Sequence, residues 1–162
     1  MKSHRPNWGL PLGTGVSYHR SVSEEPVPLV EILLVDDSDA DNFLHQRVIK
    51  KLGCTNHVET CENGREALDY LESTKGSEPP RPSLIFLDLN MPAVDGWEFL
   101  ARYEETDGRQ PPIIVMLTTS HNPDDRTRAE AHPSVSDFLI KPLTKDSLRE
   151  VLHKFFPSHG WQ

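Results

Sequence analysis

The chain has 162 residues, of which 36% are hydrophobic and 26% are charged, and this balance is typical of a globular domain with a sizeable core. Its formal net charge of -8 argues against nucleic acids and anionic membrane surfaces as partners. The longest apolar run, residues 113–117, is too short to cross a membrane or to form a secretory signal. The two cysteines, Cys54 and Cys61, are too few for a secreted disulfide framework, so we interpret them as buried free thiols in a cytoplasmic protein.

Composition divides the chain into three parts. Residues 1–28 contain four prolines and no apolar periodicity, which predicts a flexible N-terminal tail. Residues 29–156 carry the apolar patterns and form the predicted domain. Residues 157–162 are expected to be a C-terminal tail.

Short apolar runs alternate with segments of helical periodicity along the predicted domain. The first run, residues 31–36, predicts a strand, and a helix from Ser38 to Leu52 follows it. The helix places apolar residues at helical spacing, namely Phe43, Leu44, Val48, Ile49 and Leu52. Further strands are expected at residues 57–61, 83–88, 113–117 and 137–140, each followed by a helix whose first turn carries a capping residue, namely Asn63, Asp95, Asn122 and Thr144.

Five strands that alternate with five helices indicate an α/β fold. Strands joined by helical crossovers run parallel, and right-handed crossovers place helices on both faces of the sheet. The sequence therefore predicts a doubly wound sheet of five parallel strands. In such sheets the ligand site lies beyond the carboxyl ends of the strands.

Polar residues with chemical potential follow four of the predicted strands. Asp36 and Asp37 follow the first strand, Asp88 the third, Thr118 ends the fourth and Lys141 follows the fifth. Three neighbouring carboxylates repel one another, and their oxygen ligands suit a hard cation such as Mg²⁺. An aspartate can accept a phosphoryl group, while a hydroxyl and an ammonium group can bind its oxygens. The set therefore predicts Mg²⁺-dependent phosphorylation of an aspartate.

The residues around these positions carry a resemblance to a known family. The segments are residues 34–38, 87–92 with Asp95 and Gly96, 117–120 and 138–142. Together and in this order they resemble the receiver domain of two-component response regulators, over essentially all of residues 30–156. The resemblance implies a flavodoxin-like (βα)5 sheet with strand order 2-1-3-4-5. It also implies a signalling phosphoacceptor rather than an enzyme, which receives its phosphoryl group from a sensor histidine kinase or a histidine phosphotransfer protein.

The resemblance assigns the acceptor and the metal ligands residue by residue. Asp88 would be the phosphoacceptor. Asp36, Asp37 and Asp88 would hold Mg²⁺, together with the backbone carbonyl of Asn90.

The resemblance also assigns the residues that bind the phosphoryl group and report its arrival. Thr118 and Lys141 would contact the phosphoryl oxygens, and Phe138 would be the aromatic residue of the switch. This position is frequently tyrosine in the family, so burial of the ring is less costly here. The residue after the key threonine is often alanine or glycine, whereas here Thr119 is expected to slow the reaction with small phosphodonors.

The chain continues for only six residues after Phe156, which is far too few for a DNA-binding output domain. We therefore expect a stand-alone receiver whose output is a protein contact or onward phosphotransfer. The resemblance implies a switching face made of the fourth helix, fifth strand and fifth helix, which is also a possible homodimer interface. Residues 81–90 and 117–125 are similar to regulators paired with bacterial phytochrome kinases.

Two other readings of the same residues stay open. A phosphatase of the haloacid-dehalogenase type also uses a strand-end aspartate, Mg²⁺, a threonine and a lysine. It needs an acid two residues after the nucleophile, where this chain has Asn90. The second reading is a module of the same fold that works without phosphorylation, and replacement of Asp88 by asparagine distinguishes it from a phosphoacceptor.

Overall fold

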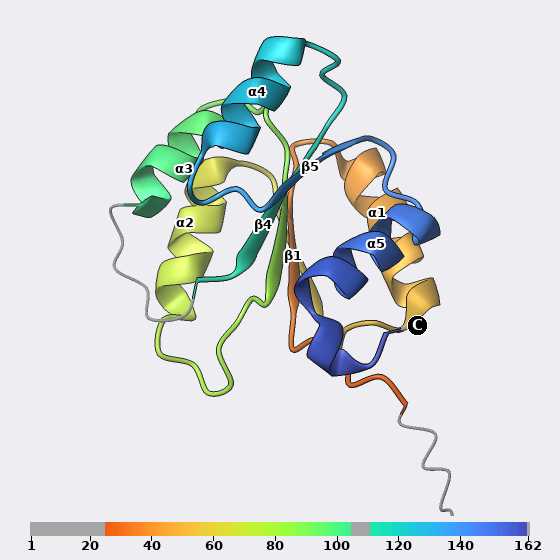
Figure 1. The fold of residues 1–162 in the computed structure, drawn as a ribbon. Helices are drawn as coiled ribbons and strands as arrows, with labels where there is room; N and C mark the ends of the chain where they lie inside the picture. Colours follow the sequence, from red (N-terminus) through yellow and green to blue (C-terminus); the bar gives the residue numbers. More distant parts are fainter. Residues whose placement is uncertain (1–24, 105–110, 162) are drawn as a thin grey trace, which may run out of the picture.

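The computed structural model describes residues 25–104 and 111–161. Its centre is one parallel sheet in the order β2-β1-β3-β4-β5, which confirms the predicted fold class and strand order (Figure 1). The strands are β1 (Ile32–Val35), β2 (Val58–Cys61), β3 (Leu84–Leu87), β4 (Ile113–Thr118) and β5 (Asp137–Ile140).

Helices cover both faces of this sheet, as the crossover rule requires. Helices α1 and α5 lie on one face, and α2, α3 and α4 lie on the other (Figure 1). Their bounds are α1 (Asp39–Leu52), α2 (Gly64–Ser73), α3 (Gly96–Glu104), α4 (Pro123–Ala131) and α5 (Lys145–Phe155), and a short 3₁₀ helix follows at Pro157–His159. Among the described helices, none has the length and apolar character that a membrane span needs.

Burial alternates along the central strands because successive side chains point to opposite faces. Leu33 and Val35 of β1 belong to the core under α2 and α3, whereas Ile32 and Leu34 belong to the core under α1 and α5. All four are at most 2% exposed. Two apolar cores thus hold the sheet from both sides, and the strand ends are left to carry the polar groups.

The register of the strands brings their carboxyl ends to one edge. Val35 pairs with Cys61 on one side and with Leu87 on the other. The next residues continue the pattern, since the Asp36 N–H donates to the Cys61 carbonyl at 3.0 Å and the Asp88 N–H donates to the Val35 carbonyl at 2.9 Å. Asp36 and Asp88 are therefore fixed by backbone hydrogen bonds where β1 and β3 end.

The predicted capping residues begin the helices as expected. The side chains of Asn63, Asn122 and Thr144 accept hydrogen bonds from backbone N–H groups of the first turns of α2, α4 and α5. Asp95 accepts from the Glu98 N–H at 2.8 Å before α3. These local bonds satisfy amide groups that have no partner inside a helix, which is why short polar side chains predict the helix starts well.

The inward face of α1 differs from the apolar pattern. Phe43 and Leu44 are 60% and 51% exposed, and the buried positions of the helix are Asn42, His45 and Ile49. The first turns of α1 pack against the polar ends of the strands, so hydrogen-bonding side chains face inward there. Apolar spacing alone therefore gave the wrong face for the first half of this helix.

The predicted tails fall partly outside the described residues, since residues 1–24 are not described. The Val27 N–H donates to the His159 carbonyl at 2.8 Å, and Leu29 is fully buried. Trp161 packs against the core under α1 and α5. The domain limits of 29–156 stay a prediction. The structure adds the contacts of Val27 and Trp161, which lie beyond these limits.

The two cysteines are buried and free, which confirms their interpretation as unpaired thiols. Burial raises the pKa of Cys54 to about 11 and that of Cys61 to about 12. Both thiols are therefore neutral and act as small apolar residues of the two cores.

Candidate functional site

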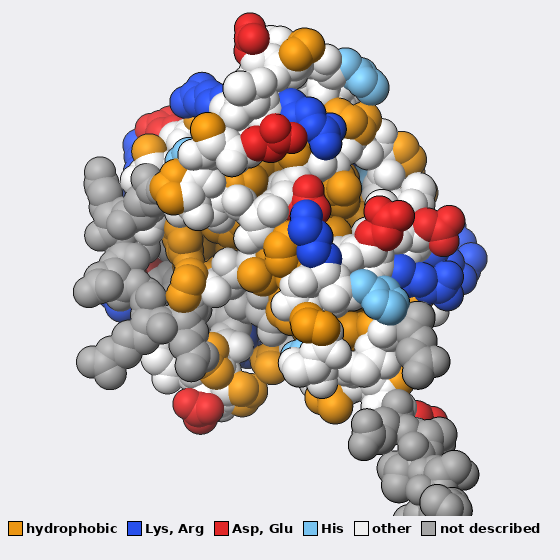
Figure 2. Space-filling model, viewed as in Figure 1, with side chains coloured by type: hydrophobic (Ala, Val, Ile, Leu, Met, Phe, Trp, Pro, Cys, Tyr) orange, Lys and Arg blue, Asp and Glu red, His pale blue; other side chains and the backbone are white. Residues whose placement is uncertain are grey.

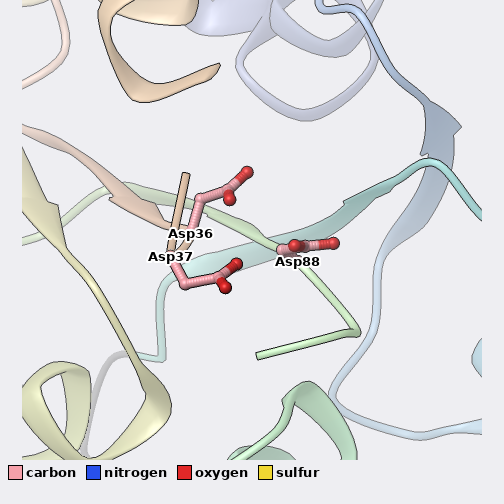
Figure 3. A group of neighbouring side chains, drawn as sticks. All are labelled: Asp36, Asp37 and Asp88. Atoms are coloured by element: carbon pink, nitrogen blue, oxygen red, sulfur yellow. The ribbon is translucent and has the colours of Figure 1, made fainter. Parts of the chain in front are cut away.

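Three carboxylates meet at the carboxyl edge of the sheet, as the strand pattern predicts. Asp36 and Asp37 follow β1 and Asp88 follows β3, and one oxygen of each lies within 4.8 Å of the others (Figure 3). Asp36 and Asp88 are 5% and 6% exposed, whereas Asp37 is exposed. The cluster therefore has two buried members and one that faces solvent.

Lys141 brings a positive charge from the end of β5 into this cluster. Its backbone N–H donates to the Thr118 carbonyl at 2.8 Å, which fixes the chain beside β4. Its Nζ lies 2.5 Å from Asp36 Oδ2 and 3.4 Å from Asp88 Oδ2. Burial alone would lower the pKa of Lys141, but hydrogen bonds to Asp36 and Asp41 and the charge of Asp88 outweigh burial and raise it to about 12. Lys141 is therefore a permanent cation.

One ammonium group does not balance the acidic cluster. Burial raises the pKa of Asp88, and the charge of Asp36 adds to this effect, while Lys141 opposes it. The donor set consists of carboxylate oxygens only, and a hard divalent cation prefers such ligands. The residues present therefore fit Mg²⁺, which Asp36, Asp37 and Asp88 would hold through their carboxylate oxygens.

The loop after Asp88 is held close to the start of α3. A Cβ atom at Gly96 would lie 2.6 Å from the carbonyl oxygen of Asp88, so the close approach requires glycine. The Gly96 N–H donates to the Leu89 carbonyl at 3.0 Å. Asn90 lies exposed in this loop, and its carbonyl as a metal ligand stays a prediction.

Thr118 and Phe138 occupy the positions that the resemblance implies, on neighbouring strands. Thr118 is fully buried, and its hydroxyl accepts from the Ser120 N–H at 3.2 Å. Phe138 is 4% exposed and belongs to the core under α2 and α3. The guanidinium carbon of Arg126 lies 5.5 Å from the centre of its ring. The ring at the predicted switch position therefore points inward in this structure.

The structure adds three residues of α1 that the strand-end pattern missed. The Asp41 carboxylate lies 2.9 Å from the Lys141 ammonium. Asn42 donates from Nδ2 to the Asp36 carbonyl at 2.9 Å, and its Oδ1 is buried without a hydrogen-bond partner among the described residues. His45 accepts from the Leu143 N–H at 3.3 Å. The signal for all three was a polar face at spacings of three and four residues, which the apolar residues of the helix obscured.

His45 is a neutral member of this group. Burial lowers its pKa, and the nearby positive charge of Lys141 lowers it further. The neutral imidazole accepts the backbone hydrogen bond from Leu143, which joins α1 to the segment before α5.

With this geometry in view, comparison with known proteins gives the family. The profile of the response regulator receiver domain matches residues 32–153. The chain belongs to the response regulator receiver family. Receiver domains of this family are the regulator half of two-component systems, so membership confirms the resemblance and removes the haloacid-dehalogenase alternative.

Individual relatives agree with this assignment. A probable methanogenesis regulatory protein, FilR2 from Methanothrix harundinacea, is 37% identical over 123 residues, which are 76% of this chain and 79% of the relative. The structure of the bacteriophytochrome response regulator AtBRR has a TM-score of 0.67 at 30% identity and covers 84% of this chain and 97% of its own. The Mn²⁺-bound structure of response regulator Rcp1, a protein of Synechocystis, has a TM-score of 0.62 at 36% identity and covers 78% of this chain and 94% of its own.

Proposed function

We propose that Asp88 of this receiver accepts a phosphoryl group from a phosphohistidine, in a reaction that depends on Mg²⁺. The observation that carries the proposal is the convergence of Asp36, Asp37, Asp88 and Lys141 at one edge of the sheet. The donor would be a sensor histidine kinase or a histidine phosphotransfer protein. The similarity to a bacteriophytochrome response regulator supports a kinase of the phytochrome type.

The chemistry follows from the residues around the acceptor. An Asp88 carboxylate oxygen attacks the phosphorus atom, the P–O bond forms and the P–N bond to the donor histidine breaks. The electron pair of that bond stays on the imidazole, and the product is an acyl phosphate on Asp88. Bound Mg²⁺ would supply positive charge for the phosphoryl oxygens.

The other residues of the site bind and orient the group as it arrives. Asp36 and Asp37 would hold the cation, and the Lys141 ammonium would pair with a phosphoryl oxygen. The Thr118 hydroxyl would donate its proton in a hydrogen bond to a second oxygen, since in its present contact with the Ser120 N–H it acts only as acceptor. The reaction leaves one phosphoryl group on each chain, so the protein acts as a signalling phosphoacceptor and not as a turnover enzyme.

The output that we propose is a change in the face made of α4, β5 and α5. On this face, acidic, basic and apolar side chains are interspersed, as Figure 2 shows in the view of Figure 1. Such a mixed surface suits a protein partner better than nucleic acid. The proposal therefore includes protein contacts or onward phosphotransfer from a cytoplasmic protein, with homodimerisation through this face as one form of contact.

Beryllium fluoride, a mimic of the phosphoryl group, tests the site without a kinase. We expect a bound signal in fluorine NMR that requires both Mg²⁺ and the carboxylate of Asp88. Asp88→Asn should abolish the signal, whereas Asp39→Asn, which removes an exposed carboxylate from the first turn of α1, should retain it. A bound signal that persists in Asp88→Asn would place the acceptor elsewhere, and no signal in folded wild-type protein would favour a module that works without phosphorylation.

A further inference from the structure

Lys141 is shared among three carboxylates, and one of them is not a strand-end residue. Its Nζ lies 2.5 Å from Asp36, 2.9 Å from Asp41 and 3.4 Å from Asp88. Asp36 and Asp88 belong to the proposed metal and acceptor site, whereas Asp41 comes from the first turn of α1. The ammonium group is therefore closer to the α1 side of the site than to the acceptor.

The backbone of Asp41 is fixed where it can hold the ammonium group. Its N–H donates to the Ser38 side chain at 3.2 Å, which caps α1. The next residue, Asn42, ties the same turn to the Asp36 carbonyl. The Asp41 side chain is 34% exposed and that of Lys141 is 7% exposed, so the carboxylate lies at the rim and the ammonium lies beneath it.

The contact creates a competition once a phosphoryl group arrives. An ammonium group has three protons to donate, and an incoming phosphoryl group adds negative charge to a site that already holds an excess of carboxylates. Lys141 must then move its hydrogen bonds toward the acceptor. Asp41 opposes this movement because its carboxylate attracts the same ammonium group from 2.9 Å away.

We propose that Asp41 is a positioning residue that holds Lys141 on the α1 side of the resting site and competes with the phosphoryl group for its ammonium. The competition with a phosphoryl group rests on the proposed function. The position of Lys141 in the resting site does not depend on that function. Asp41 would thus set the balance between the resting and the phosphorylated site without contact to the phosphoryl group itself.

Replacement of Asp41 by asparagine removes the competing charge and keeps the size of the side chain. We expect the dissociation constant for beryllium fluoride at saturating Mg²⁺ to fall by about threefold to tenfold, because Lys141 is free to turn to the acceptor. Mg²⁺ should bind more weakly by a similar factor, since the ammonium group then lies closer to Asp88. Fluorine NMR titration and calorimetric titration of Mg²⁺ measure the two constants.

Asp39→Asn is the matched control for the charge. Asp39 lies in the same first turn of α1, is exposed, and is not one of the three carboxylates that pair with Lys141 among the described residues. It should change either constant by less than about twofold. Equal effects of Asp39→Asn and Asp41→Asn, or weaker binding of beryllium fluoride by Asp41→Asn, would overturn the proposal.

The ammonium resonance of Lys141 separates this proposal from the proposed function. In protein without Mg²⁺ and fluoride, nitrogen NMR of the lysine side chain should show a shift of Lys141 in Asp41→Asn and none in Asp39→Asn. Asp41→Glu keeps the charge and should stay near the wild-type resonance. Asp41→Ser also removes the charge and should shift the resonance, so it replaces Asp41→Asn if the asparagine variant fails to fold. An unchanged resonance in Asp41→Asn would refute the role of Asp41, whereas a wild-type protein that fails to bind beryllium fluoride would refute only the proposed function.

Discussion

Charge balance at the level of single residues explains why the site is suited to a cation. Lys141 is buried with its ammonium group between carboxylates of the strand ends and of α1. One ammonium group cannot neutralise all of these carboxylates. Burial raises the pKa of Asp88, and the charge of Asp36 raises it further. The negative charge of Asp88 is consequently unfavourable in these surroundings. A divalent cation in the cluster, or a phosphoryl group on the acceptor, would change the free energy of that charge.

Thr119 carries a prediction at the same scale. It follows the buried Thr118 and is exposed just beyond the carboxyl end of β4, at the same edge of the sheet as Asp88. We expect its branched side chain to hinder small phosphodonors, so Thr119→Ala should raise the rate of phosphorylation by acetyl phosphate by roughly threefold. Intact mass measured over time gives the rate, and an unchanged rate would show that Thr119 does not limit small donors.

Among the elements, the strands and helix starts were predictable and the inward side of α1 was not. Apolar runs and capping residues act locally, so Ile32–Val35 or the cap at Thr144 is readable from a few neighbouring residues. The polar face of α1 depends on the strand ends that it covers, and these come from distant parts of the chain. The same reason hid Asp41, whose partner Lys141 lies 100 positions away.

Helix α4 has little apolar packing against the rest of the fold. Its one buried residue in the described structure is Ala129, and the Arg128 guanidinium carbon lies 4.0 Å from the centre of the Trp97 ring of α3. Arg126 covers the ring of Phe138 in a similar way. Contacts of this kind contribute about 0.5–1 kcal/mol each at exposed sites, so these two contacts hold α4 only weakly. This is the behaviour that a switching face requires.

Arg128→Ala should therefore loosen α4 while the rest of the fold stays intact. We expect faster amide hydrogen exchange in residues 123–131 and a loss of at most about 1 kcal/mol in the free energy of unfolding. Arg149→Ala is the matched control, since Arg149 is an exposed arginine of α5 that pairs with Asp146. If exchange in α4 is the same in both variants, the contact with Trp97 does not hold the helix.

At the scale of the whole molecule, stability comes from two apolar cores that share one sheet. Each core contains one cysteine, Cys61 beside Val35 and Cys54 beside Leu29. The five-stranded architecture could be predicted because strands and helices alternate regularly from Ile32 to Phe155. The contacts of Val27 and Trp161 could not, because single residues outside the periodic segments give no pattern.

The buried thiols predict how the fold responds to alkaline pH. Their pKa is raised by burial from 9.0 to about 11 for Cys54 and about 12 for Cys61. As the pH rises, the thiols of the unfolded chain therefore lose their protons at a lower pH than those of the folded protein. The stability that the neutral buried thiols contribute is complete below pH 9.0 and is lost as the pH rises toward their pKa values in the folded protein. The free energy of unfolding should fall by about 1.4 kcal/mol per pH unit and thiol in this window.

Urea unfolding at about pH 8 and about pH 10.5 measures this slope. The double variant Cys54→Ala and Cys61→Ala should be less stable at the lower pH but should lose less stability between the two. A double variant with the wild-type slope would assign the alkaline loss to other groups, of which Tyr70 and Tyr103 also have a raised pKa through burial.

The central claim is that Asp88 becomes an acyl phosphate, and chemical trapping of that bond tests it most directly. The protein and the Thr119→Ala variant, which we expect to react faster, are incubated in parallel with Mg²⁺ and acetyl phosphate. Both are then treated with borohydride, which reduces an aspartyl phosphate to homoserine. Peptide mass spectrometry should find homoserine at position 88, and chelation of Mg²⁺ should abolish it. Homoserine at another aspartate, or a phosphoryl group retained by Asp88→Asn, would contradict the account.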